Sequence, residues 1–273
     1  MYLVTGATGN VGSEVVKALA AAGEPVRGLV RRPGGIPGAQ VVVGDLADPD
    51  SMSEALAGVR AVFLLPGFAG LPRTLRLAGE AGVERVVLLS GGSAASGDTT
   101  NAVARYMIES ERAVEESGLR WTFVRSGAFM SNALRWRPQL AAGDEVRVSF
   151  PTVPAAVIDP FDVAAVVTEA LLGDGHAGAV YRVSGPESML PEAQVAVLGQ
   201  VLGRDLRCVG LSNGAARVEM EASMPREYVE AFFSFYVDGT LDESEVLPTV
   251  EEVTGRRPRT FEQWARAHAA EFA

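Results

Sequence analysis

The sequence predicts an α/β fold in which a doubly wound parallel sheet is followed by a smaller C-terminal lobe. Short apolar strands alternate with amphipathic helices through the first half of the 273-residue chain, as they do where helices cover both faces of a parallel sheet. The first strand runs directly into glycines spaced three apart. Beyond residue 125 the periodicity weakens and prolines become frequent. We therefore expect a core over residues 1–125 and mainly the lobe over residues 126–273, with about 155–185 returning to the core sheet.

The loop after the first strand has the composition that a bound pyrophosphate requires. Gly6 permits the tight turn off the strand, Gly9 omits a side chain where phosphate approaches, and Gly12 lets the next helix pack on the strand. The amides that open this helix face the anion, backed by a macrodipole of roughly half a positive charge. Apolar residues at helical spacing continue the segment, namely Val11, Val15, Val16 and Leu19. The pattern predicts a Rossmann-type dinucleotide site with contacts from Gly6, Thr8, Gly9, Asn10, Val11 and Gly12.

The second strand, expected over residues 25–30, indicates which dinucleotide binds. It ends in Arg31 and Arg32, where an NAD site usually carries an acidic residue for the ribose 2′-hydroxyl. A guanidinium can bind a 2′-phosphate through two parallel hydrogen bonds, a geometry that lysine cannot copy. We expect NADP(H) to be preferred over NAD(H), with Arg31 as the first candidate for the phosphate and Arg32 as the second.

The alternation of strands and helices continues after the arginine pair. Further strands are expected over residues 41–43, 61–65, 85–89 and 120–125, and helices over residues 50–57, 71–81 and 102–117. The last of these helices is expected to end at Gly118, which favours a C-cap. A later aromatic helix over residues 228–236 either packs the lobe or forms a wall of the substrate site.

The strand ends supply the remaining candidates for the cofactor site, because ligands bind beyond the carboxyl ends of the strands in such sheets. Asp45 and Leu46 are expected near the adenine, where the Asp45 carboxylate can accept from the exocyclic amine. Asp45 is equally suited to capping the next turn. Leu65 and Pro66 are expected beside the ribose, and Ser90 near the nicotinamide.

Composition argues against several other classes of function. The net charge of −10 at pH 7 disfavours a general binder of nucleic acid or of an anionic membrane. The single cysteine, Cys208, excludes an intramolecular disulfide and a cysteine-based metal cluster, and His176 and His268 are not placed to hold a metal. No apolar run approaches the roughly twenty residues of a membrane helix. The first strand begins near residue 2, leaving no room for a signal peptide before it, so we expect a cytoplasmic monomer or homodimer.

Taken together, these motifs resemble the NmrA-like family of atypical short-chain dehydrogenases. The resemblance is carried by residues 5–12, 30–33, 116–125, 129–132, 158–164 and 178–185. That family includes NADPH-dependent quinone reductases and redox-sensing relatives, so the resemblance implies the fold and the cofactor. It also implies that the loop containing Phe129, Met130 and Asn132 lines the substrate pocket.

The chain departs from the usual short-chain dehydrogenases at their catalytic pair, Tyr-x-x-x-Lys on the long helix after the fifth strand. There the lysine lowers the tyrosine pKa and the tyrosine protonates the nascent alkoxide. Tyr106 lies on the expected helix, but Ser110 stands four residues on, and Lys17 is the only lysine in the protein. Tyr106 should then keep a pKa near about 10 and deprotonate reluctantly. A purely structural role for it stays open.

A strongly electron-poor acceptor needs little general-acid catalysis, because its reduced form is already fairly stable. The sequence therefore favours an NADPH-dependent reductase of a small quinone-type molecule or electron-poor carbonyl compound, and an enone fits the same logic. The expected substrate contacts are Phe129, Met130, Asn132 and Trp136, and the catalytic candidates are Tyr106 and Ser90. The alternative is a non-enzymatic NADP(H) sensor that binds a partner protein.

Overall fold

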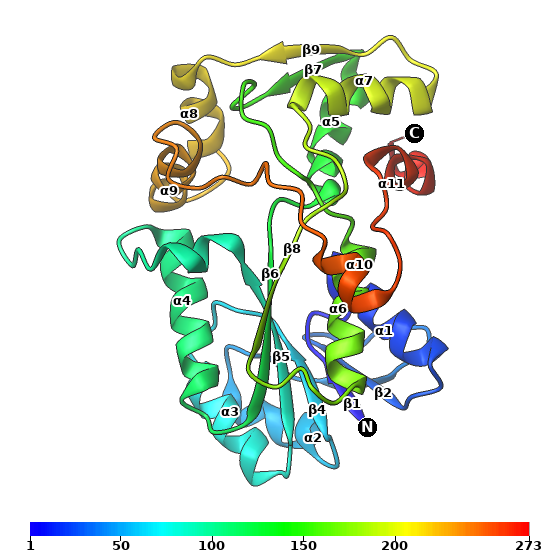
Figure 1. The fold of residues 1–273 in the computed structure, drawn as a ribbon, viewed down its shortest axis with the longest axis vertical. Coiled ribbons are helices and arrows are strands. Elements are labelled where there is room, and N and C mark those ends of the chain that lie inside the picture. Colours follow the sequence, from blue (N-terminus) through cyan, green and yellow to red (C-terminus); the bar gives the residue numbers. More distant parts are fainter. Residues whose placement is uncertain (273) are drawn as a thin grey trace.

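The computed structural model describes residues 1–272 and contains one large parallel sheet in this part of the chain (Figure 1). Its strands are β1 (Tyr2–Val4), β2 (Val26–Val30), β3 (Gln40–Val43), β4 (Ala61–Leu64), β5 (Arg85–Gly91), β6 (Arg120–Ser126) and β8 (Ala179–Val183). They lie in the order β3-β2-β1-β4-β5-β6-β8, and every neighbouring pair is parallel. The predicted α/β Rossmann-type architecture is thus confirmed, with the change of direction in strand order between β1 and β4.

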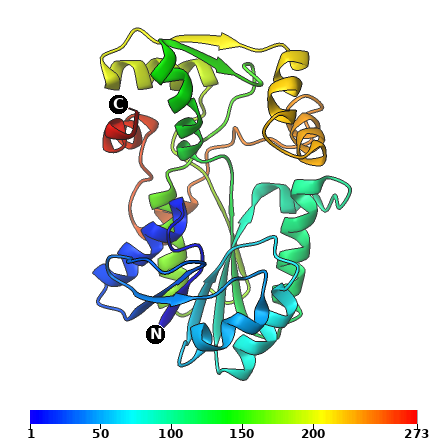
Figure 2. The ribbon, with the colours of Figure 1, turned by 180° about the vertical axis from the view of Figure 1, so that it is seen from behind.

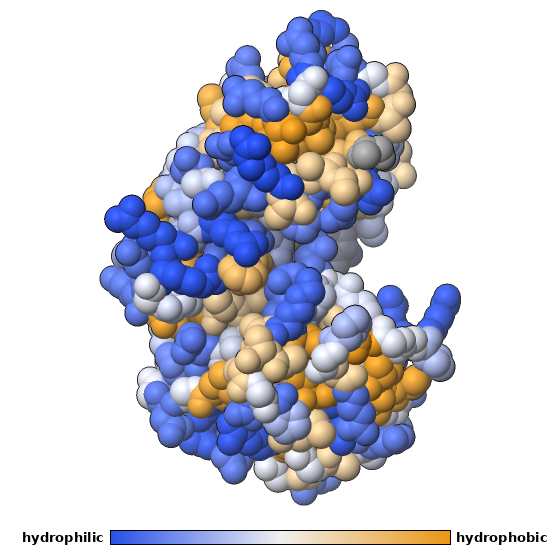
Figure 3. Space-filling view, turned by 90° about the vertical axis from the view of Figure 1, so that its right-hand side faces the viewer, coloured by the Kyte–Doolittle hydropathy of each residue, from blue (hydrophilic) through white to orange (hydrophobic). Residues whose placement is uncertain are grey.

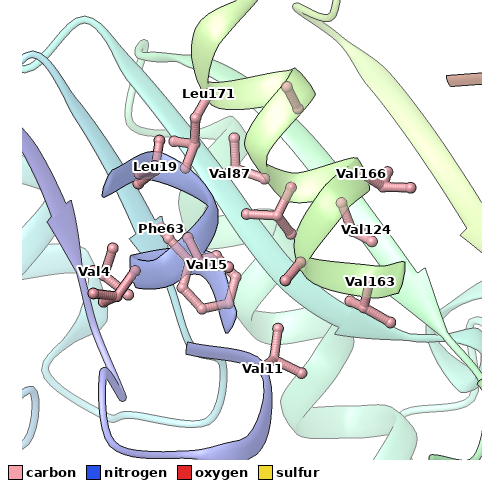
Figure 4. Packing of buried hydrophobic residues seen from close by; sticks show 14 of the residues in the cluster. Val4, Val11, Val15, Leu19, Phe63, Val87, Val124, Val163, Val166 and Leu171 are labelled. Carbon is pink, nitrogen blue, oxygen red and sulfur yellow. The ribbon is translucent and has the colours of Figure 1, made fainter. Parts of the chain in front are cut away.

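Helices cover both faces of this sheet. On one face lie α1 (Asn10–Ala21) and α6 (Pro160–Leu172), and on the other lie α2 (Ser53–Leu56), α3 (Leu71–Glu80) and α4 (Ala102–Glu115). Alternate residues of β1 point to opposite faces, so that Val4 packs under α1 while Leu3 packs under α2 and α3. Figure 4 shows the α1–α6 side, where Val15 and Leu19 meet Val163 and Leu171. Both faces are apolar, which is why these strands read as continuous hydrophobic runs.

Two of the expected helices differ in detail from the observed ones. The helix expected over residues 50–57 is divided into a 3₁₀ turn, Pro49–Met52, and the short α2. The Asp48 side chain accepts from the Asp50 amide and so begins this segment with a tight turn. The helix expected over residues 102–117 ends earlier, because α4 stops at Glu115 and Gly118 follows with a φ of 74° in the left-handed region.

The rest of the chain builds a lobe over the carboxyl ends of the strands (Figures 1 and 2). Its elements are a 3₁₀ segment (Met130–Trp136), α5 (Arg137–Ala142), β7 (Glu145–Val148), α7 (Pro191–Leu202), β9 (Arg207–Gly210), α8 (Asn213–Glu221), α9 (Arg226–Tyr236) and α11 (Phe261–Ala267). Between α9 and α11 the chain returns to the core, where α10 (Thr249–Thr254) packs on α6 and β8. Strands β7 and β9 pair in parallel, and the lobe has its own core around the fully buried Trp264. The aromatic segment expected over residues 228–236 is helical, as α9, and lies above α4.

The chain passes between the core and the lobe through several segments that are held to one another. The Met130 amide donates to the Ile158 carbonyl at 2.9 Å, and the Ala156 amide donates to the Glu243 carbonyl at 2.7 Å. Gly185 completes this junction, because a Cβ there would lie 1.9 Å from the Val157 carbonyl oxygen. Figure 3 shows the surface hollowed between the two parts of the molecule.

Within residues 1–272, none of the helices has both the length and the apolar character needed to cross a bilayer.

Candidate functional site

The glycines of the first loop are required by close backbone packing. Gly6 has a φ of 58°, a left-handed conformation that side chains disfavour. A Cβ on Gly12 would lie 2.1 Å from the Gly6 carbonyl oxygen, so α1 can approach the loop only without one. The Gly9 amide donates to the Gly6 carbonyl at 2.8 Å, and Gly9 is the N-cap of α1. The first turn of α1 therefore opens at the carboxyl edge of the sheet, beside the switch between β1 and β4.

The residues predicted to contact the cofactor in this loop differ in how exposed their side chains are. Thr8, Gly9 and Asn10 are exposed, whereas Val11 is 6% exposed and its side chain lies in the core. Val11 can thus offer only its backbone to a ligand. The Asn10 amide nitrogen donates to the Ser131 hydroxyl at 3.1 Å. This bond joins the glycine loop to the loop of residues 129–132, so the expected cofactor and substrate loops meet in space.

The ends of β2 and β3 lie side by side, since Val30 pairs with Val43. Arg31 and Arg32 follow β2 and are exposed, and neither forms an ion pair within residues 1–272. The Asp45 carboxylate accepts from the Ala47 amide at 2.9 Å and so caps the turn after β3. Leu46 is buried beneath it at 5% exposure.

The turn after β4 packs directly on α4. The Leu65 amide donates to the Thr5 hydroxyl at 3.0 Å, which ties this turn, with Pro66, to the end of β1. The Gly67 amide donates to the Ser110 hydroxyl at 2.9 Å, and that hydroxyl donates to the Tyr106 carbonyl at 2.6 Å. Ser110, which stands at the lysine position of the usual pair, is therefore engaged in backbone hydrogen bonds.

Tyr106 lies half-buried against the same turn. Burial raises the pKa of its phenol above the usual value, and the neighbouring Tyr228 adds to the shift. The two rings meet edge to face with centroids 6.5 Å apart. Tyr106 is thus a neutral hydrogen-bond donor at ordinary pH.

Ser90 is only 1% exposed, and its hydroxyl donates to Glu111 at 2.6 Å. Glu111 in turn accepts two hydrogen bonds from Arg125, at 2.8 and 2.6 Å. This bidentate pair joins α4 to β6 beneath the carboxyl edge of the sheet. A hydrogen bond from the Ser90 hydroxyl to a ligand would require the one to Glu111 to break.

The expected substrate residues are divided between surface and core. Asn132 is exposed, and Phe129 and Trp136 are half-buried. Met130 is 1% exposed and packs in the core of the lobe, where it supports the loop from behind. A separate hollow on the lobe, formed by lobe residues alone, is lined by Leu134, Arg137, Pro138, Leu140, Ala141, Leu202, Arg204, Glu271 and Phe272.

The structure adds two residues that the sequence did not single out. The Tyr236 hydroxyl, at the end of α9, donates to the Glu243 carboxylate at 2.8 Å. The carboxylate lies on Gly127, the first residue after β6, where a Cβ would be 3.4 Å from its oxygen. Tyr236 belongs to the aromatic segment over residues 228–236, which the sequence already marked as a candidate wall of the substrate site. Glu243 stands in an acidic run that looks like solvated surface.

Comparison with known proteins identifies the family. A family model described as NAD(P)H-binding matches residues 6–174. The chain is 44% identical to a (4-alkanoyl-5-oxo-2,5-dihydrofuran-3-yl)methyl phosphate reductase of Streptomyces griseus, over 100% of this chain and 99% of that one. It is 36% identical to an NAD(P)H azoreductase of Xenophilus azovorans, again over 100% and 99% of the two chains.

Solved structures agree with the fold. An NADPH-dependent quinone oxidoreductase of Escherichia coli, complexed with NADPH, superimposes with a TM-score of 0.81 at 21% identity, covering 99% of this chain and 100% of that one. NmrA, a negative transcriptional regulator, superimposes with a TM-score of 0.75 at 19% identity, covering 97% and 94%. The chain therefore belongs to the NAD(P)H-binding family and is an oxidoreductase, and it shares the fold of NmrA.

Proposed function

We propose that this protein transfers a hydride from NADPH to an electron-poor conjugated small molecule, a quinone-type or activated carbonyl compound, without a tyrosine–lysine pair. The observation that carries the proposal is the hydrogen bond of 3.1 Å between Asn10 and Ser131. It brings the glycine loop against the loop of Phe129 and Asn132, so a nicotinamide ring and a flat acceptor can share one site. Such positioning is the main contribution of a protein whose cofactor supplies the reaction.

The residues present fit a dinucleotide phosphate. The glycines leave the backbone of the first loop bare, and the opening turn of α1 presents its amides to an anion. Arg31, with Arg32 as second candidate, would hold the 2′-phosphate at the end of β2. Leu65 and Pro66 would flank the ribose, and Leu46 and Asp45 the adenine. When bound, NADPH supplies the hydride; the protein binds and orients it.

The acceptor class is supported by what the relatives are named for. The Streptomyces griseus reductase is named for a dihydrofuranone that carries an alkanoyl group, and the Xenophilus azovorans enzyme for azo compounds. Both are conjugated acceptors of low electron density. Phe129 and Trp136 offer half-buried aromatic surface for such a molecule, and exposed Asn132 offers a hydrogen-bond donor.

The absence of a lysine partner is supported by the environment of Ser110. Its hydroxyl is bonded to Gly67 and to the Tyr106 carbonyl, so it has no proton to pass to Tyr106. The raised pKa of Tyr106 points the same way, because a lysine neighbour would lower it. Tyr106 would serve as a neutral donor.

The test is NADPH consumption by the purified protein across quinones, enones and aromatic ketones, with NADH as the control cofactor. Turnover with NADPH on at least one of these acceptors is the expected result. Tight NADPH binding with background consumption on every acceptor would overturn the proposal and favour a cofactor sensor, whose affinities for NADP⁺ and NADPH would have to differ.

Cofactor preference is tested separately with Arg31→Ala. Loss of a charge-assisted bidentate contact should weaken NADPH by about 10- to 100-fold and leave NADH nearly unchanged. Arg60→Ala is a matched control, because Arg60 lies over the Tyr2 ring, at the opposite end of β4 from the turn that holds Leu65. Equal losses for both cofactors would contradict the assignment of Arg31.

A further inference from the structure

The Tyr236–Glu243 pair lies where core and lobe join. Glu243 belongs to the segment that returns from α9 to α10, and its backbone carbonyl is held by the Ala156 amide at 2.7 Å. Its side chain lies on Gly127 and accepts from the Ala128 amide. Both residues belong to the loop that leads from β6 to Phe129. The Glu243 carboxylate is therefore fixed at the carboxyl edge of the sheet, at the end of β6.

Glu243 is a half-buried carboxyl group without an ionic partner. Within residues 1–272, no arginine or lysine forms an ion pair with it, and its side-chain partners are the Tyr236 hydroxyl and one backbone amide. Burial raises its pKa above the usual value, and the neighbouring Asp242 carboxylate adds to the shift. A carboxyl group whose pKa is raised by burial, at the carboxyl edge of such a sheet, is typical of a functional site.

Tyr236 has aromatic and cationic neighbours as well. Its ring packs on Phe150 at 5.1 Å and on Phe232 at 6.1 Å between centroids. The positive charge of Arg135, on the 3₁₀ segment after Met130, acts on the phenol and partly opposes the rise in its pKa. Burial dominates that rise, followed by the charge of Glu243.

We propose that Tyr236 is the proton donor for acceptors whose reduced form is strongly basic, and that Glu243 acts through it as the proton relay. The inference rests on the proposed function. It answers the question that the missing lysine leaves open, namely which group supplies the proton after hydride transfer to a ketone or an enone.

The electron-poor carbon of the acceptor gains the hydride from NADPH, a C–H bond forms, and the π electron pair moves to oxygen as an alkoxide or enolate. That oxygen takes the phenolic proton of Tyr236, Tyr236 regains a proton from the Glu243 carboxyl group, and Glu243 takes one from water. The acceptor is reduced by two electrons, NADPH is oxidised to NADP⁺, and one proton is consumed.

The protonation state of Glu243 sets the direction of the hydrogen bond between the two side chains. With Glu243 ionised, the Tyr236 hydroxyl donates to it and is occupied. With Glu243 protonated, the carboxyl can donate to the phenol oxygen, which frees the phenolic proton for the acceptor. Ketone reduction should therefore be fastest at low pH and fall as pH rises through the raised pKa of Glu243.

The experiment compares two acceptors in single-turnover reactions with saturating NADPH. Tyr236→Phe should slow reduction of an activated ketone by about 100-fold or more, the usual size of a general-acid contribution. Glu243→Gln should slow it only in repeated turnovers, because its amide can donate to the phenol oxygen but cannot return a proton to it. Quinone reduction, whose product is a stable oxyanion, should change less than about 3-fold because it needs no proton in the slow step. Glu243→Gln should also abolish the fall in ketone rate with pH.

The matched controls are Tyr181→Phe and Glu245→Gln. Tyr181 is another bonded tyrosine, 2.7 Å from His176 on the edge strand, and Glu245 is an exposed acid of the same segment, paired with Arg182 at 2.9 Å. Both should behave as the wild type with either acceptor. NADPH affinity, measured by fluorescence titration, should be unchanged in all four variants, which shows that they are folded.

Three results would overturn the relay. They are equal losses with ketone and quinone, no loss with either, and a pH profile that Glu243→Gln leaves intact. A wild-type protein inactive on every acceptor would instead defeat the proposed function, and the relay with it.

Discussion

At the first turn of α1 there is no room for one more carbon atom. A Cβ on Gly12 would lie 2.1 Å from the Gly6 carbonyl oxygen and 2.7 Å from its carbonyl carbon. Both of these are backbone atoms of a loop already held by the Gly9 amide, so they cannot turn aside as a side chain would. Close packing alone thus explains why the motif has a glycine at position 12.

Gly12→Ala should therefore destabilise the protein by about 1–3 kcal/mol through overpacking and weaken NADPH by displacing the loop. Urea unfolding and cofactor titration measure the two effects. Gly214→Ala is the control, because nothing lies within 4 Å of a Cβ there and the residue is in helix α8. That change should leave NADPH binding intact and stabilise by about 0.5–1 kcal/mol. Equal behaviour of the two variants would contradict the packing argument.

At the scale of the element, α4 joins the core to the lobe through its first residues. The Asn101 side chain accepts from the Val103 and Ala104 amides at 3.0 and 3.1 Å, which caps the helix. Its amide nitrogen also donates to the Ala231 carbonyl of α9 at 3.2 Å. One buried side chain therefore fixes the start of α4 and the position of the helix above it.

Asn101→Ala should cost about 1–2 kcal/mol for the lost cap and more for the unpaired Ala231 carbonyl. It should also increase amide hydrogen exchange in α9 ahead of the rest of the chain. Ser212→Ala is the comparison, since Ser212 caps α8 with a single bond of 3.3 Å and holds no second element. If α9 exchanges no faster in Asn101→Ala than in Ser212→Ala, the two helices are not coupled in this way.

The elements also show how far the sequence alone could lead. The strands were predictable because both faces of the sheet are covered, which leaves continuous apolar runs such as residues 61–64. The division of residues 49–56 into a 3₁₀ turn and a short helix was not predictable from periodicity. Asp48 and Pro49 favour a tight turn there over a regular helix start. The glycine loop could be placed from its spacing. Tyr236 and Glu243 could not be predicted as a pair, because their hydrogen bond and the contact of Glu243 with Gly127 depend on how α9 and the returning segment pack on the lobe.

At the scale of the whole molecule, a buried carboxylate ties the last part of the chain to the core. Asp162, on α6, is fully buried and accepts from the Arg256 side chain at 2.8 Å and from the Arg259 amide at 2.7 Å. Both arginines also lie over the Phe161 ring, at 4.5 and 3.5 Å. This cluster holds the link between α10 and α11 against the amino end of α6.

Asp162→Ala should therefore destabilise the protein by about 1–3 kcal/mol, because it leaves the Arg259 amide and the partly exposed Arg256 side chain without their acceptor. The loss is measured by urea unfolding. Glu251→Ala removes an exposed ion pair with Arg257, 3.7 Å apart, and should cost at most about 1 kcal/mol. Similar values for the two variants would mean that the cluster around Asp162 contributes no more than a surface pair.

The several passages of the chain between core and lobe limit how this protein can change in evolution. The chain crosses the junction in four segments, residues 126–130, 156–160, 184–191 and 238–249. Backbone hydrogen bonds and the close packing at Gly185 join these segments there. A lobe attached in this way cannot be exchanged as a cassette by one recombination event, since no single cut releases it. Under the proposed function, a new acceptor is therefore accommodated in place, by point substitutions in the loop of residues 129–132 and along α9, while the junction itself stays fixed.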